Sequence, residues 1–280
     1  MTDTMTPYAV EAFNVAADSE NKIHDDAVAS RFGFSGALVP GSAVFGYMAH
    51  QPVARWGRDW LTRGTADCRF GHPVYQGATT TVSAHSADSA DGVLALQVHS
   101  QGQLCATGSA ALPPPETPPS VDSFKLSTPP AQRPAANPAS LAQGLVLCTL
   151  SEATTREQAS RWLADLRETD PLYESEQLMH PATLLRLCNA VLVQNVLLGP
   201  WIHTGSRIRN FHPMPVGASL SARAVVLRNH EHKGHLIVDL DVLVIIDGKT
   251  AAARIEHSAI YLPRQVREAQ QAESPAKLRP

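Results

Sequence analysis

Apolar and polar positions follow a clear succession of periods in the first half of the chain. Alternation over residues 8–16 predicts a strand, and a helical period over residues 23–32 predicts a short helix that Gly33 ends. Residues 42–56 are apolar at helical spacing and predict a longer helix. After this helix, segments of alternating apolar and polar residues predict four more strands, at residues 65–70, 78–85, 93–100 and 104–112. Residues typical of turns separate these segments.

The second half repeats this succession. Residues 143–149 are predicted as a strand and residues 155–166 as a helix. Residues 181–198 form a long apolar segment with a proline at its first position, which is typical of a helix start. Four strands are again predicted after it, at residues 207–211, 218–227, 235–246 and 250–262.

The two halves also share residues at one offset. A His-Pro pair at residues 72–73 recurs 140 positions later at residues 212–213. The same offset relates residues 38–41 to residues 178–181, and each of these segments leads into a long helix. Shared residues at one spacing are harder to obtain by chance than a shared order of elements. We therefore interpret the chain as a duplication.

The order of elements predicts the fold class. Consecutive antiparallel strands with one long helix inserted after the first strand bury that helix against one face of the sheet. Helices 42–56 and 181–198 are apolar around too much of their surface to lie with one side in water. The expected fold is α+β, a tandem (double) hotdog in which each unit is an antiparallel sheet wrapped around a long central helix.

A proline-rich segment separates the halves. Residues 113–138 hold nine of the 21 prolines and cannot sustain regular helix or ladder hydrogen bonds. We expect an extended linker that crosses the surface, with Phe124 and Leu126 packed against a domain. The chain then divides into an N-terminal domain at 1–112, the linker at 113–138, a C-terminal domain at 139–265 and a polar tail at 266–280.

Composition and charge narrow the class of protein. With 280 residues, of which 44% are hydrophobic, the chain can fill a core in each of two domains. The formal charge of −3 is spread without blocks, which argues against nucleic acid or an anionic membrane as a partner. Residues 1–17 lack signal-peptide features, and no apolar stretch reaches membrane-spanning length. We expect a soluble, cytoplasmic protein.

The cysteines and the known short motifs give no sign of a metal or cofactor. The four cysteines lie far apart and form no CxxC pair or Cys/His cluster: Cys68, Cys105, Cys148 and Cys188. We expect buried thiols and neither disulfides nor zinc. The sequence contains no P-loop, no dinucleotide-binding glycine fingerprint, no GxSxG and no HExxH. No cofactor is therefore expected.

One segment of the first half carries candidate chemistry. Asn21 and His24 precede the short helix, a Gly-Phe pair follows it at residues 33–34, and Gly41 opens the long helix. This segment resembles that of MaoC-like, (R)-specific enoyl-CoA hydratases, which reads Asp-x-Asn-Pro-hydrophobic-His, a helix, Gly-Phe, and then Ala-His-Gly at the start of the central helix. The resemblance covers residues 19–57 closely and most of both halves loosely.

The resemblance implies a reaction and the roles of several residues. In that family the Asp and His activate a water that adds to a 2-enoyl thioester, and backbone N–H groups near the Gly bind the enolate oxygen. His24 stands in the position of the base, and Gly41 and Ser42 stand where these amides are supplied. Such chemistry needs a base within hydrogen-bond reach and donors at a helix N-terminus.

The sequence departs from the family pattern at three positions. Ser19 occupies the position of the Asp, Lys22 that of the Pro, and Pro40 that of the His in Ala-His-Gly. Without the Asp, a protonated His24 lacks its usual counter-charge and the water loses one acceptor. The nearby carboxylates that are candidates for that role are Asp18, Glu20, Asp25 and Asp26.

The second half lacks the Asp-x-Asn-x-x-His segment, so we interpret it as the non-catalytic partner that helps to shape the pocket. Arg207 and Arg209 alternate on one face of a predicted strand, which suits contacts with the phosphates of CoA. His203 precedes that strand, and with Ser42 and the two arginines it completes the predicted substrate contacts.

These observations favour a hydro-lyase that acts on a 2-enoyl or 3-hydroxyacyl thioester, with CoA as the expected carrier. The alternatives are a hotdog acyl-CoA thioesterase and a non-catalytic acyl-CoA-binding protein, for which Ser19 is the strongest support. The predicted catalytic set is His24, Ser19, Asn21 and Gly41, and no metal is expected. Because one chain holds both units, we expect a monomeric pseudo-dimer or a homodimer.

Overall fold

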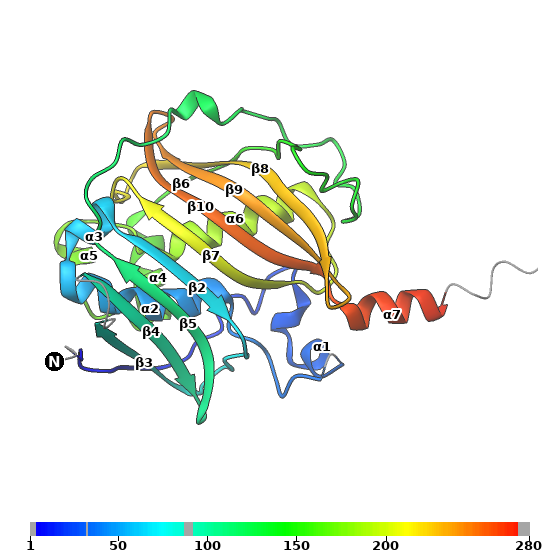
Figure 1. Ribbon diagram of the computed structural model, residues 1–280, viewed down its shortest axis with the longest axis horizontal. Coiled ribbons are helices and arrows are strands. Elements are labelled where there is room, and N and C mark those ends of the chain that lie inside the picture. Colours follow the sequence, from blue (N-terminus) through cyan, green and yellow to red (C-terminus); the bar gives the residue numbers. More distant parts are fainter. Residues whose placement is uncertain (1–3, 32, 87–91, 274–280) are drawn as a thin grey trace, which may run out of the picture.

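The computed structural model describes residues 4–31, 33–86 and 92–273. Phe32, where the first predicted helix was expected to end, lies outside the described residues, as does the last part of the predicted tail, 274–280. In both halves one strand is followed by helices and then by four strands, which is the predicted order, and Figure 1 shows their arrangement.

The described strands form one antiparallel sheet. The first half contributes β1 (Tyr8–Glu11), β2 (Thr65–Phe70), β3 (Thr79–Ser86), β4 (Val93–Ser100) and β5 (Gln103–Ala111). The second half contributes β6 (Leu150–Ala153), β7 (Ile202–Asn210), β8 (Ser219–His232), β9 (His235–Ile246) and β10 (Thr250–Leu262). The strand order is β1-β3-β4-β5-β2-β7-β10-β9-β8-β6, and the halves join where Ala66 of β2 pairs with Ile208 of β7.

The strand order has the symmetry of a duplication. Outward from the central β2–β7 pair, the first half continues through β5, β4, β3 and β1. The second half continues through β10, β9, β8 and β6, which are the equivalent strands in the same order. The repeated order of elements that the sequence predicts is therefore confirmed in the topology.

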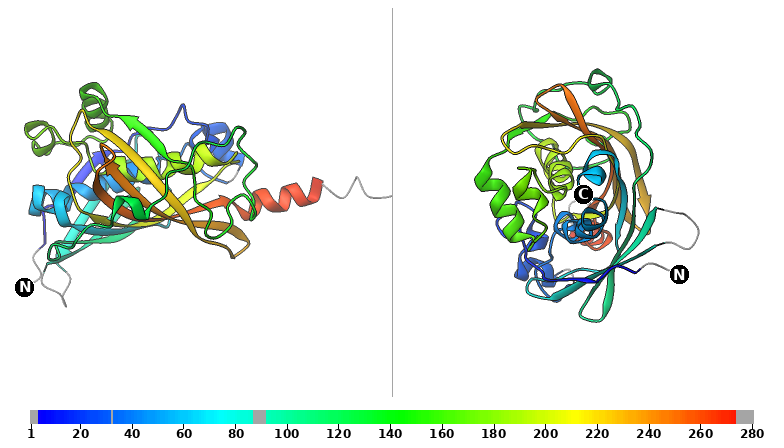
Figure 2. Two further views of the ribbon diagram at one scale, coloured as in Figure 1. Left: turned by 90° about the horizontal axis from the view of Figure 1, so that it is seen from above. Right: turned by 90° about the vertical axis from the view of Figure 1, so that its left-hand side faces the viewer.

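Two long helices lie in the concave side of the curved sheet, α2 (Gly41–Trp56) and α6 (Ala182–Asn195). Figure 2 (right) shows the sheet bending around them. The helices approach closely at Gly46, where a Cβ atom would lie only 3.3 Å from the Cβ of Ala182. Their apolar side chains join those of the sheet in one core that includes both halves. The predicted wrapping of a sheet around central helices is confirmed.

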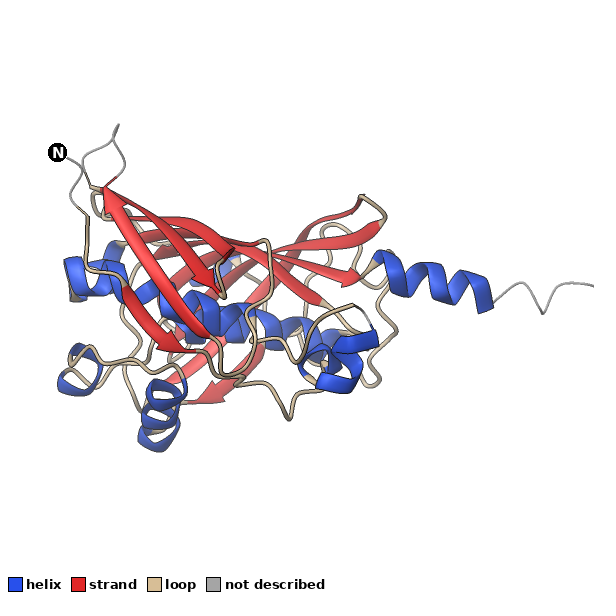
Figure 3. Ribbon diagram, turned by 90° about the horizontal axis from the view of Figure 1, so that it is seen from below, coloured by secondary structure: helices blue, strands red, loops and turns tan. Residues whose placement is uncertain are grey.

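Short helices lie on the same side of the sheet as α2 and α6, which is below the sheet in the view of Figure 3. They are η1 (Lys22–His24), α1 (Asp26–Arg31), α3 (Arg58–Arg63), α4 (Arg156–Asp165) and α5 (Leu172–Ser175). The predicted helix at 23–32 is divided because Asp25 is extended, with φ −103° and ψ 135°. The helix predicted at 155–166 is α4, and it begins with a capping box in which Thr155 and Gln158 exchange hydrogen bonds.

Several predicted strand boundaries are wrong. The strand predicted at 8–16 ends at Glu11, and the strand predicted at 218–227 continues to His232. Residues 143–149 do not form a regular strand, because Gly144 has φ +81° and the segment makes irregular hydrogen bonds with β8 before β6 begins at Leu150. The seventh strand begins at Ile202 and not at residue 207. Its polar first residues are held as a strand by β10, a neighbour that local propensity does not reveal.

The proline-rich segment crosses the convex face of the second-half sheet in extended form, with one turn, η2 (Val121–Ser123). Phe124 is buried among β9 and β10 side chains and Phe211, as predicted. Arg223 donates hydrogen bonds to the carbonyls of Val121 and Phe124 at 2.9 and 3.0 Å. The prediction for Leu126 is wrong, because this side chain is 69% exposed.

The C-terminal part of the described chain forms a further helix. Helix α7 (Arg264–Glu273) extends away from the body of the molecule, where the sequence predicted only a polar tail (Figure 3).

All four cysteines are buried free thiols, as expected, and burial raises the pKa of Cys68 to about 12. Among the residues that the structure describes, no helix is long and apolar enough to cross a lipid bilayer.

Candidate functional site

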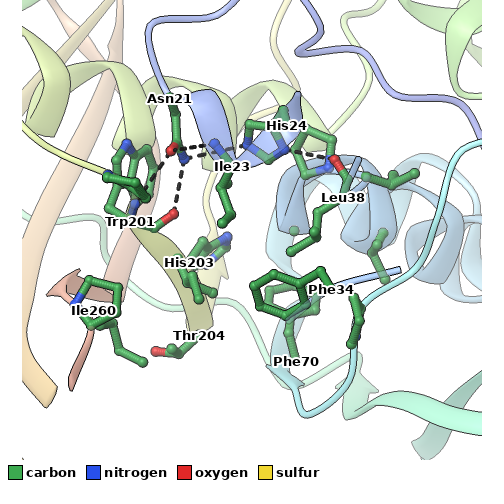
Figure 4. A pocket seen from close by; sticks show the side chains of 18 of the residues that line it. Asn21, Ile23, His24, Phe34, Leu38, Phe70, Trp201, His203, Thr204 and Ile260 are labelled. Atoms are coloured by element: carbon green, nitrogen blue, oxygen red, sulfur yellow. Dashed lines mark hydrogen bonds between the residues drawn. The ribbon is translucent and has the colours of Figure 1, made fainter. Parts of the chain in front are cut away.

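A pocket of about 310 Å³ opens where the two halves meet (Figure 4). The first half lines it with the segment before α2, the first turns of that helix and residues 70–74. The second half lines it with Asn189 of α6, residues 200–204 and the ends of β9 and β10. Most of the lining side chains are apolar, among them Ile23, Phe34, Leu38, Val44, Phe70, Ile202 and Ile260.

His24 lies in this pocket with a fixed tautomer. Its Nδ1 is 2.7 Å from the backbone carbonyl of Leu38, and a carbonyl can only accept, so Nδ1 carries the proton of the neutral ring. Nε2 therefore presents a lone pair, and Asn21 Nδ2 lies 3.5 Å from it. Burial lowers the pKa of His24, although the Leu38 carbonyl favours the protonated form. His24 is thus a neutral, oriented base near pH 7.

Asn21 joins the two halves of the site. Its Nδ2 donates to the carbonyl of Trp201 at 2.9 Å, and its Oδ1 accepts from the N–H of the same residue at 3.3 Å. The Oδ1 also caps η1 by accepting from the N–H of Ile23. Asn21 is 6% exposed, so it holds the segment before His24 against a residue 180 positions later. This side chain positions the site.

The candidate carboxylates do not approach His24. Asp25 and Asp26 cap backbone N–H groups of α1 and of the following loop, and Glu20 pairs with Arg133. Within residues 4–31, 33–86 and 92–273, His24 makes no hydrogen bond or ion pair with a carboxylate. The same residues contain no group of His, Cys, Asp and Glu side chains that could hold a metal ion.

Ser19 and Ser42 lie outside the pocket lining. The Ser19 hydroxyl donates to the backbone carbonyl of Asn21 at 3.3 Å, so it acts on the turn that carries Asn21. Ser42 is buried in the first turn of α2. Gly41, at the start of the same helix, does line the pocket. The first N–H groups of an α-helix have no intrahelical acceptor and lie at its positive end, so this edge of the pocket suits an oxygen that carries negative charge.

Gly41 has no room for a side chain. A Cβ atom there would lie 2.8 Å from Nδ1 of His203 and 2.9 Å from Cε2 of Phe70. We expect Gly41→Ala to lower the free energy of unfolding by about 1–3 kcal/mol through overpacking, measured by urea denaturation. Gly199→Ala is the matched control, because nothing lies within 4 Å of that position. Equal stability of the two variants would contradict the close approach at Gly41.

A β-bulge turns His203 into the pocket. In β7 the side chains of Ser206, Ile208 and Asn210 are buried, and simple alternation would place His203 on the opposite face. The register against β10 shifts by one residue at Thr204, which brings His203 to the buried face. The edge of Phe70 lies against its ring, with centroids 4.9 Å apart.

Arg207 and Arg209 share one strand face, as expected, but the structure does not bring them to the pocket. Both lie on the convex face of the sheet. Arg207 approaches Glu256 at 3.4 Å, and Arg209 donates to the carbonyl of Pro114 and pairs with Glu116 in the proline-rich segment. Their contacts are therefore with this chain.

Sequence reasoning missed Trp201, Asn189 and His257. Trp201 and Asn189 gave no signal, because their role depends on a contact between the halves. His257 could have been found. It follows Ile255 and precedes Ala259 at two-residue spacing in β10, so it is a polar residue at an inward position of a strand. Its Nδ1 lies 3.0 Å from the Ser206 hydroxyl, which in turn lies 2.9 Å from Nε2 of His203.

The chain is similar to known proteins in structure and not in sequence. No family model matches the chain, and no curated protein matches it in sequence. The Mycobacterium tuberculosis protein Rv0216, described as a double hotdog, is 14% identical, with a TM-score of 0.60 over 91% of this chain and 96% of that one. The chain has a double-hotdog fold. The predicted fold class is thereby confirmed.

Two other similar structures carry different activities in their names. A proposed MaoC-domain dehydratase from Chloroflexus aurantiacus is 12% identical, with a TM-score of 0.61 over 94% of this chain and 95% of that one. A proposed thioesterase from Novosphingobium aromaticivorans is 10% identical, with a TM-score of 0.54 over 92% and 96%. At these identities the likeness shows the fold alone, so the function must be argued from the site.

Proposed function

We propose that this double-hotdog protein is a hydro-lyase that adds water to a 2-enoyl thioester or removes it from a 3-hydroxyacyl thioester. The observation that carries the proposal is the neutral His24 in a largely apolar pocket beside the N-terminus of α2. Among the described residues, its Nε2 lone pair accepts only a long contact of 3.5 Å from the Asn21 amide. The dehydratase activity in the name of the similar Chloroflexus aurantiacus protein and the resemblance of residues 19–57 agree with this reaction class.

The proposed reaction uses His24 and the start of α2. His24 Nε2 takes a proton from a water molecule as its oxygen bonds to Cβ of the enoyl group. The C=C electrons move toward the thioester carbonyl, whose oxygen becomes an enolate that the first-turn amides at Gly41 and Ser42 stabilise. The proton on His24 then returns to Cα, so one water is consumed and His24 regains its neutral form.

The lining of the pocket supports an acyl substrate. Its apolar side chains would bury an acyl chain and exclude bulk water from the reacting atoms, while few polar groups converge on one end. In place of the family carboxylate, the Leu38 carbonyl orients His24. A carbonyl dipole fixes the tautomer but neutralises a protonated imidazole less than a carboxylate does, so we expect a slow member of this reaction class.

The experiment that tests the proposal is an assay with crotonyl-CoA and longer 2-enoyl-CoAs. We expect loss of the enoyl absorbance without release of free CoA thiol. Release of the thiol would instead identify a thioesterase, and neither change would exclude both activities for these substrates.

The pH dependence of this reaction follows from His24. Its pKa is lowered by burial below the usual value of 6.5, and only the neutral form accepts a proton. We therefore expect kcat/KM to fall on the acid side with a midpoint below pH 6.5, where the pH equals the lowered pKa. A pH–rate profile of the wild-type protein measures this, and an acid limb above pH 7 would contradict it.

A second candidate is a non-catalytic acyl-thioester-binding protein. It is favoured by the polar partners of His24, which are a carbonyl and an amide and include no carboxylate in the described chain. Thermal stabilisation by acyl-CoA without turnover would support this candidate over the hydro-lyase.

A further inference from the structure

His203 carries a ring nitrogen that no group in the described chain uses. The residue is 6% exposed, and its Nδ1 is buried without a hydrogen-bond partner. Its other nitrogen is bound, since Nε2, the Ser206 hydroxyl and Nδ1 of His257 form a chain with distances of 2.9 and 3.0 Å. A buried polar atom without a partner is costly. Nδ1 is therefore suited to a partner that comes from outside the chain.

The hydrogen bonds of the Ser206 hydroxyl with His203 and His257 indicate which ring nitrogen of His203 carries the proton. Burial lowers the pKa of His203 to about 3 and that of His257 well below its usual value, so each neutral ring carries one proton near pH 7. If Ser206 donated to His257, the remaining N–H of His257 would be a buried donor with no acceptor among the described residues. If Ser206 donates to His203, the unpaired N–H is instead Nδ1–H of His203. That ring lines the pocket, where a ligand can accept the hydrogen bond, whereas His257 is 0% exposed and does not line the pocket. The proton of His203 is then on Nδ1.

This N–H lies at the start of α2. The close approach to Gly41 puts Nδ1 beside the first turn of a 16-residue helix, where backbone amides are also unpaired. The ring cannot turn away easily, because the edge of Phe70 and the ring of His257 pack against it, the latter with centroids 4.2 Å apart. A side-chain donor and backbone donors thus gather at one edge of the pocket.

We infer that His203 is a catalytic hydrogen-bond donor, whose Nδ1–H binds the carbonyl oxygen of the acyl thioester together with the amides at Gly41. The inference rests on the acyl-thioester site of the proposed function and assigns it a residue from the second half. His203 does not transfer its proton. Its hydrogen bond strengthens as negative charge develops on that oxygen, while His24 alone moves the proton of the water.

The test is a chromophoric ligand, a 2-enoyl-CoA with a para-dimethylaminophenyl group on Cβ, whose absorbance moves to longer wavelength when its carbonyl is polarised. We expect the wild-type protein to bind it with such a red shift. His203→Phe keeps a ring against Phe70 but loses the donor, so it should lose at least half of the shift. Its kcat with crotonyl-CoA should fall about 10²-fold with little change in KM.

Two further variants separate the roles of the residues. Ser206→Ala removes the group that sets the tautomer of His203, so it should reduce the red shift less than His203→Phe does. His24→Gln should lose turnover and keep the full shift, because His24 acts on the water and not on the carbonyl.

The outcomes distinguish this inference from the proposed function. A red shift that is unchanged in folded His203→Phe overturns the inference and leaves the hydro-lyase intact. A shift that depends on His203 without any hydration supports the inference and overturns the hydro-lyase. If the wild-type protein does not bind the ligand, both are overturned.

A measurement on the wild-type protein does not depend on the folding of variants. With ¹⁵N-labelled histidine, the NMR shifts of His203 should report a neutral ring protonated at Nδ1, and that proton should move downfield when the chromophoric ligand is added. A ring protonated at Nε2 in both states would overturn the inference.

Discussion

His24→Gln is expected to reduce kcat/KM for 2-enoyl-CoA hydration by about 10²–10⁴-fold, the usual loss when a general base is removed. The amide can still occupy the space of the ring and hydrogen-bond to the Leu38 carbonyl, but it has no basic lone pair. The loss should therefore appear in kcat. A continuous assay of the enoyl absorbance measures it, with thermal denaturation to confirm that the variant is folded.

The matched control for this prediction is His99→Gln. His99 is an exposed histidine of β4 that does not line the pocket, and the chemical change is the same. We expect this variant to keep the wild-type rate. Equal rates in the two variants would remove His24 from the mechanism, and the proposed hydro-lyase would then need another base.

Glu168→Gln is expected to lower the free energy of unfolding at pH 7 by about 2–4 kcal/mol, because it removes a buried charged acceptor. The Glu168 carboxylate lies 2.8 Å from Nδ1 of His50 in α2 and 3.4 Å from Nε2 of His180, just before α6. It also accepts the backbone N–H groups of Thr169 and Asp170. Its side chain is 2% exposed, so water does not replace these contacts. Urea denaturation measures the loss.

The effect of Glu168→Gln should depend on pH. Burial acts to raise the pKa of Glu168, but the adjacent His180 and His50 outweigh it and hold the pKa below its usual range. A lowered pKa means that the folded state favours the charged form. Its contribution is complete above the unfolded pKa of about 4.3 and is lost as the pH falls through the folded value. The difference between wild type and variant should therefore shrink below about pH 4.

Glu174→Gln is the matched control for this stability prediction. Glu174 is exposed on α5, six positions after Glu168, and the substitution is chemically identical. We expect a change within about 0.5 kcal/mol, as for most surface substitutions. If Glu168→Gln changed the free energy of unfolding as little as Glu174→Gln, the Glu168 carboxylate would not stabilise the junction of the two halves.

Part of the candidate site was predictable from the sequence. The predictable residues lie close together along the chain, and the others come together only by packing of the two halves. His24, Asn21 and Gly41 stand in one short segment and at the start of the next helix, and it was the resemblance of this segment to MaoC-like hydratases that indicated a site. Trp201 could not be found in this way. Its backbone bonds to Asn21 across 180 positions of sequence, and only the packing of one half on the other creates that contact.

The two arginines and His203 illustrate the same limit on one strand. Alternation correctly placed Arg207 and Arg209 on a common face, but it could not tell which face is concave. The bulge at Thr204 then reverses the alternation, so His203 enters the pocket while the arginines pair on the convex side. Bulges depend on the register of the partner strand, which leaves little trace in local sequence.

The sequence by itself determined the order of helices and strands, the duplication, the double-hotdog class and the segment that holds His24. These depend on periodicity and spacing, which act over a few residues at a time. The tertiary structure alone decided that the Leu38 carbonyl orients His24, that His203 faces Gly41 and that Glu168 contacts His50 and His180 from the two halves. Each of these contacts is set by how the two halves or distant loops pack, and packing is a property of the whole chain.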